Sequence, residues 1–128
     1  MRTHIGAGIV GMVLVASVVS LSAHHTVASL FDTTTLVTLK GTLTEVEWKN
    51  PHVFLHLDTR GDDGGTVAWT VETLNLQGLS RVGLNQGSLK VGDVLSMTVC
   101  VKKDGARWAV TDAIAMPGGT AYVRVGGC

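Results

Sequence analysis

Several features that mark nucleic-acid-binding proteins and common enzymes are missing from this sequence of 128 residues. Its ten basic and ten acidic side chains cancel, so no basic field attracts a phosphate backbone, and we expect no nucleic-acid partner. The sequence contains no G-x-S-x-G nucleophile motif, no cysteine–histidine spacing typical of zinc, and no calcium-binding loop. Internal repeats are also absent. We therefore expect a single domain that is not an enzyme.

The beginning of the sequence has the layout of a secretory signal peptide. Arg2 supplies a positive charge, residues 5–19 form an apolar run without a charge, and small residues follow at 20–23. A signal peptidase would cut there, after Ser22 or Ala23. The alternative is a retained membrane anchor, but the run is shorter than the roughly 20 residues that span a bilayer. We expect cleavage, no membrane span in the processed protein, and a periplasmic or secreted location.

Removal of a signal peptide comprising residues 1–23 leaves residues 24–128, enough for one modest core. We expect one β-barrel domain with a flexible N-terminal segment and a C-terminal tail. The two cysteines, Cys100 and Cys128, allow two interpretations. They form a disulfide, as a pair in an oxidising compartment often does, or Cys100 is a small buried hydrophobe and Cys128 a free thiol in the tail.

Alternation of apolar and polar residues predicts a chain composed mainly of strands. A change of apolar phase after Leu43 predicts a β-bulge near Thr44 and Glu45, because one extra residue turns the following side chains over. Between the third and fourth strands, Thr73 or Asn75 is expected to cap a short helix. The strands are expected within residues 33–48, 53–58, 66–72, 94–102, 106–115 and 121–125.

Three strands, a connection with a helix and then a hairpin follow one another along the chain. This is the order of the five-stranded oligonucleotide/oligosaccharide-binding (OB) barrel. We therefore expect an all-β fold with one short helix, forming a small OB-like barrel of five to six strands. A small β-sandwich is the alternative. Trp48, Trp69 and Trp108 share the phase of the inward-facing residues, which predicts core packing rather than a stacking surface for sugars.

Two adjacent histidines at the expected cleavage point are the first candidates for a binding site. If His24 becomes the new N-terminus, its amine and imidazole can chelate one Cu(II), and a third histidine can complete the ligand set. If the processed chain begins at Ala23, the amine, two backbone amides and the His25 imidazole can surround the ion in a plane. The alternative is a terminus that binds nothing specific in the cell.

His52 and His56 are the next candidates. They share a strand face, but four residues of strand separate them by roughly 13 Å, so they cannot chelate one ion together. His52 lies beside the Pro51 corner and is the better partner for His24 and His25; the alternative is that it bonds loop carbonyls. We interpret His56 as an ordinary residue of the solvent face.

A set of motifs covers nearly the whole processed chain: Ala23-His24-His25, Phe31-Asp32, the run from Gly41 to Trp48, Asn50-Pro51-His52, Trp69-Thr-Val-Glu72 and Leu89-Lys-Val-Gly-Asp93. Together these motifs resemble a family of small exported bacterial proteins that is catalogued as a domain of unknown function. The resemblance implies an exported small β-barrel and supplies no reaction. Thr26 stands where the family usually has serine, which keeps the hydroxyl.

The leading functional hypothesis is a non-enzymatic binding or accessory domain of the periplasm. Its expected metal site consists of His24, His25 and His52, with copper as the ligand. The rival hypothesis is a protein–protein interaction module that docks onto another envelope protein. It would use the outer strand face with Phe54 and His56 or the terminal edge strand near Val123.

Overall fold

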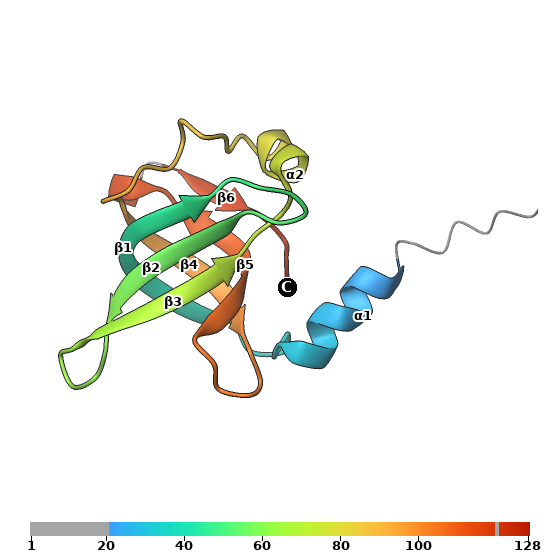
Figure 1. The fold of residues 1–128 in the computed structure, drawn as a ribbon, viewed down its shortest axis with the longest axis horizontal. Coiled ribbons are helices and arrows are strands. Elements are labelled where there is room, and N and C mark those ends of the chain that lie inside the picture. The colour runs from blue at the N-terminus through green and yellow to red at the C-terminus, as the bar shows by residue number, and fades with distance from the viewer. Residues whose placement is uncertain (1–20, 120) are drawn as a thin grey trace, which may run out of the picture.

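Five strands close around one apolar core in the computed structural model, which describes residues 21–119 and 121–128, with side chains from residue 26 on (Figure 1). Within these residues a short sixth strand extends the sheet, and two α-helices and one 3-10 turn (η1) are also present. The elements are α1 (Leu21–Leu30), β1 (Val37–Glu47), β2 (Phe54–Arg60), β3 (Thr66–Glu72), α2 (Leu76–Arg81), β4 (Val94–Val101), β5 (Trp108–Ala115), η1 (Pro117–Gly119) and β6 (Tyr122–Arg124).

The strand order is that of an OB barrel. Neighbours in the sheet run β3-β2-β1-β4-β5-β6, and β3 pairs additionally with β5. This second pairing is parallel, joins residues 70–72 to residues 108–110 and closes the barrel. The predicted all-β OB-like barrel is therefore confirmed, and the strands do not form the alternative sandwich.

The core is built from alternate positions of the strands, as the period of two requires. Outward-facing positions on β2 and β3 are polar or exposed, apart from Phe54, which is apolar and partly buried. The side chains with at most 1% of their surface exposed include Leu43, Leu55, Leu57, Val71, Leu95, Met97 and Ile114.

The predicted bulge in β1 is confirmed. Leu43 pairs with Leu57 but Glu45 pairs with His56, so Thr44 is an extra residue. The insertion leaves Leu43 fully buried and turns Glu45 to the outside.

A second bulge corrects the prediction for Trp108. Thr98 pairs with Ala113 but Val99 pairs with Thr111, so Asp112 is the extra residue of β5. Both Ala109 and Ile114 therefore face the core although they are five positions apart. Trp108, next to Ala109, lies on the outer surface with 37% of its area exposed. The prediction that it packs in the core was wrong, whereas Trp69 is buried and Trp48 packs partly buried against the core.

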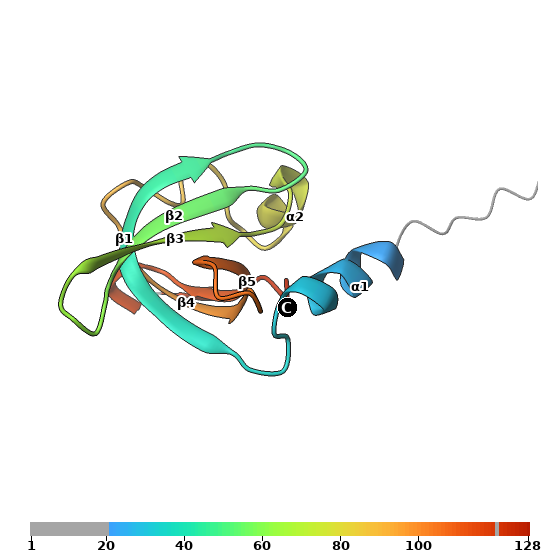
Figure 2. The same ribbon diagram turned by 60° about the horizontal axis from the view of Figure 1, so that its bottom comes forward.

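Helix α2 lies at the end of the barrel where β1 and β3 finish, and the β2–β3 hairpin projects from the opposite end (Figures 1 and 2). Leu79 of α2 is 1% exposed and belongs to the main core. Asn75 is the N-cap, because its side-chain oxygen accepts a hydrogen bond from the Gly78 amide at 2.7 Å. The chain leaves the helix through Gly83, whose φ of +86° favours glycine.

Helix α1 is not indicated by the sequence pattern. Its last turn is held by Lys103, whose Nζ donates to the Ala28 carbonyl at 2.7 Å and whose amide donates to the Leu30 carbonyl at 2.9 Å. A cation is favourable there because the carbonyl end of a helix is negative. Beside this turn, the structure joins Cys100 to Cys128 in a disulfide, and Val27 and Phe31 pack around it. None of the helices in the described part of the chain is long and apolar enough to span a bilayer.

Candidate functional site

A hollow of about 290 Å³ lies between α1 and the outer surface of β3 and β5. Thr26, Val27 and Leu30 line it from the helix, and His52 and Glu72 line it from the barrel. The two sequence regions that carry the predicted metal ligands therefore meet here, although the whole of strand β1 lies between them along the chain.

His52 is fixed in one tautomer by its neighbours. Its Nδ1 lies 3.0 Å from the Thr73 carbonyl oxygen and 3.3 Å from Glu72 Oε1. A carbonyl oxygen can only accept, so Nδ1 carries a proton, and in the neutral ring Nε2 keeps its lone pair. No described residue forms a hydrogen bond or ion pair with Nε2. A histidine that donates one ring N–H to a carbonyl or carboxylate and presents the other nitrogen has the arrangement usual for metal ligands.

The corner that carries His52 is tied to the segment between β3 and α2. The Asn50 side-chain oxygen accepts from the Leu76 amide at 3.2 Å. Val53 exchanges backbone hydrogen bonds with this segment, accepting from Thr73 and donating to the Leu74 carbonyl, both at 2.9 Å. These bonds hold the imidazole beside Glu72 without a contribution from α1.

His24 and His25 are the other two predicted ligands. Their backbones belong to α1, and their side chains lie outside the described residues. Thr26, which follows them, lines the hollow opposite His52. Since a helix rises about 1.5 Å per residue, His24 lies only about 3 Å along the axis from Thr26. Within the part of the chain that the structure describes, no three His, Cys, Asp or Glu side chains form a cluster that could hold a metal ion.

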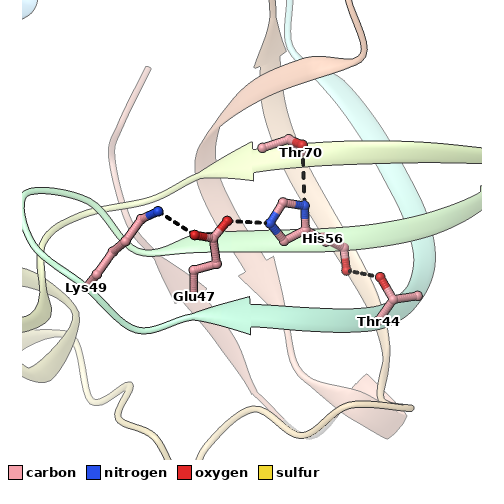
Figure 3. Close-up of polar contacts among 5 residues, drawn as sticks. All are labelled: Thr44, Glu47, Lys49, His56 and Thr70. Carbon is pink, nitrogen blue, oxygen red and sulfur yellow. Dashed lines mark hydrogen bonds and ion pairs between the residues drawn. The ribbon is translucent and has the colours of Figure 1, made fainter.

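His56 differs from His52 because both of its ring nitrogens are engaged (Figure 3). Nε2 lies 2.8 Å from Glu47 Oε1, and Nδ1 lies 3.4 Å from Thr70 Oγ1. Its carbonyl also accepts from Thr44 Oγ1 at 3.1 Å. His56 is thus a partly buried member of a polar row across β1, β2 and β3, which was not predicted from the sequence. The predicted bulge puts Glu47 on the outer face of β1, and this placement could have indicated a contact with His56 on the neighbouring strand.

Two hydrogen bonds lower the pKa of Glu47; the one from Lys49 has the larger effect and the one from His56 the smaller. The row of carboxylate, imidazole and hydroxyl has the order seen in activated nucleophiles. The 3.4 Å between Thr70 Oγ1 and His56 Nδ1 is slightly longer than the roughly 2.6–3.2 Å typical of such pairs, which are often looser without a substrate. What the contacts do directly is link the neighbouring strands β1, β2 and β3, and we assign the row to the cohesion of the sheet.

An aromatic pair lies on the same outer surface. The rings of Phe54 and Trp108 meet edge to face with centroids 6.2 Å apart. Lys49 Nζ lies 5.1 Å from the Phe54 centroid and Lys102 Nζ lies 5.3 Å from the Trp108 centroid. The bulge in β5 creates this pair, which is why the sequence pattern did not predict it.

No curated protein matches the chain. A family model described as "Family of unknown function (DUF6152)" matches residues 12–111. The match confirms the prediction that the chain belongs to a family of unknown function. Because the match covers well over half of the sequence, the chain belongs to this family of unknown function.

Proposed function

We propose that this protein is an exported, non-enzymatic binding domain that holds a copper ion where its processed N-terminus meets His52. One observation supports the proposal above the others. His52 lines the same hollow as Thr26, its Nδ1 is anchored by Thr73 and Glu72, and its Nε2 has no hydrogen bond or ion pair with a described residue.

The chemistry of the segment suits Cu(II), which prefers nitrogen ligands in a tetragonal arrangement. After cleavage behind Ala23, the new amine and the imidazole of His24 supply two nitrogens and Nε2 of His52 supplies a third. After cleavage behind Ser22, the amine, two backbone amides and the His25 imidazole supply four, and His52 approaches from the barrel. Glu72 beside His52 adds a negative charge that favours a cation in either case.

The test is a Cu(II) titration followed by EPR, on protein exported and processed by its own signal peptidase, because an added residue at the front would destroy the ligand set. We expect one tight, nitrogen-rich site. His52→Ala should weaken it by at least about tenfold. His56→Ala is the matched control, since both nitrogens of that ring are engaged, and it should leave the affinity unchanged. Equal affinities for the parent and His52→Ala would refute the proposal.

A second candidate function, docking onto an envelope protein, is favoured by the exposed edge of β6. This strand pairs with β5 over residues 113–115 and with no other described strand. A free edge can accept a strand from a partner. In-cell photo-crosslinking from β6 should then give a defined adduct that Val123→Pro abolishes and His52→Ala preserves.

A further inference from the structure

The mouth of the barrel opposite α2 is hollow. β3 pairs with β5 only over residues 70–72, so the first half of β3 diverges and the end of the barrel stays open. The result is an open cavity of about 750 Å³. Apolar groups of Leu39, Val67 and Trp69 line it. Pockets in the mouths of barrels are a common location for small-molecule sites.

Three cations from separate elements surround this mouth. Lys40 comes from β1, Arg60 ends β2, and Arg107 lies just before β5. The Arg107 guanidinium carbon lies 5.3 Å from the centroid of the Trp69 ring. The five ion pairs of the described residues include none of these three cations. They are therefore available to a ligand, unlike Lys49 and Lys102, which are each paired with a carboxylate.

Two carboxylates also line the mouth but do not neutralise the three cations. Asp63 Oδ1 accepts from the Gly65 amide at 2.8 Å and so serves the β2–β3 turn. Asp62 is exposed next to it. With both ionised, the lining residues still carry one net positive charge, although the processed protein as a whole is expected to be slightly negative.

We propose that this mouth binds a small organic anion, in which a carboxylate or phosphate group is attached to an apolar body. Arg107 is the anchor, because a guanidinium binds planar oxyanions through two parallel hydrogen bonds and its stacking on Trp69 orients it beforehand. Arg60 and Lys40 add further attraction, and the apolar body contacts Leu39, Val67 and Trp69. None of these residues belongs to the proposed copper site.

The experiment follows the indole N–H of Trp69 by NMR in the processed, oxidised protein, with Trp69→Phe to assign the signal. Phenyl phosphate and benzoate are the anionic probes, and benzamide is the neutral counterpart of benzoate. We expect saturable shifts with both anions and much weaker binding of benzamide. Arg107→Gln should weaken anion binding by at least about tenfold, the loss expected for one charge-assisted hydrogen bond or more.

Arg81→Gln is the matched control, since Arg81 is an exposed arginine at the opposite mouth and its loss should leave the shifts unchanged. A Tm equal to that of the parent would show that Arg107→Gln is folded. If it is not folded, Arg60→Gln is used as the test variant instead. The proposal is overturned if neither anion shifts Trp69, if benzamide binds as well as benzoate, or if the folded arginine variant binds like the parent.

Discussion

The two mouths of the barrel differ in what fills them: buried apolar side chains close one, and charged side chains surround an open cavity at the other. At one mouth Leu79, Leu84 and Leu89 are at most 4% exposed and join the main core. At the other, the cations Lys40, Arg60 and Arg107 surround an open cavity. Burial of apolar area is the dominant favourable term in folding, whereas exposed charges contribute little to it. The contrast implies that substitutions at the filled mouth cost stability and substitutions at the open mouth cost binding.

The largest expected effect is at the filled mouth. Leu79→Ala removes a buried side chain under α2 and should lower the free energy of unfolding by about 2–5 kcal/mol. Urea denaturation of the oxidised protein measures it. Leu76→Ala, on the same helix at 37% exposure, is the matched control and should cost much less. Equal losses at both positions would show that α2 does not seal the barrel.

The cap of the same helix should have a smaller effect. Asn75→Ala removes the acceptor for the Gly78 amide and should lower the free energy of unfolding by about 1 kcal/mol. Gln77→Ala, at an exposed position two residues on, keeps the cap and should be neutral or slightly stabilising, because alanine is the better helix former. Urea midpoints of the two variants give the comparison, and a Gln77→Ala loss as large as that of Asn75→Ala would contradict it.

The strand pattern predicts the filled parts of the molecule better than the open ones. The β1 bulge was readable because the large apolar residues Leu43 and Val46 lie on either side of it and change phase. The β5 bulge was not, because the residues around Asp112 are small or polar and show no clear phase. A core depends on many apolar positions along each strand, so its pattern survives a few ambiguous residues.

The candidate sites depend on single residues brought together by closure of the barrel. His52 could be singled out beside Pro51, but its anchor on the Thr73 carbonyl appears only once β2 and β3 pair. The open mouth was not predicted at all, because Lys40, Arg60 and Arg107 lie on separate elements with no shared sequence signal. Helix α1 was missed because its contacts with Lys103 and the disulfide are distant in sequence.

The smallest expected effect sharpens the contrast at the outer rim of the filled mouth, where Glu47 ends β1. Hydrogen bonds from Lys49 and His56 lower the pKa of Glu47 from 4.5 in the folded protein. The ionised carboxylate therefore stabilises the fold above the unfolded-state pKa, and this contribution is lost as the pH falls through the folded-state pKa. The Tm of the parent should therefore exceed that of Glu47→Gln by a small amount at about pH 7, and this excess should shrink toward about pH 3. Glu45→Gln, two positions earlier and in no ion pair with a described residue, should show no such trend. A Tm difference independent of pH would mean that the Glu47 charge does not stabilise the sheet, and that the polar row acts through neutral hydrogen bonds alone.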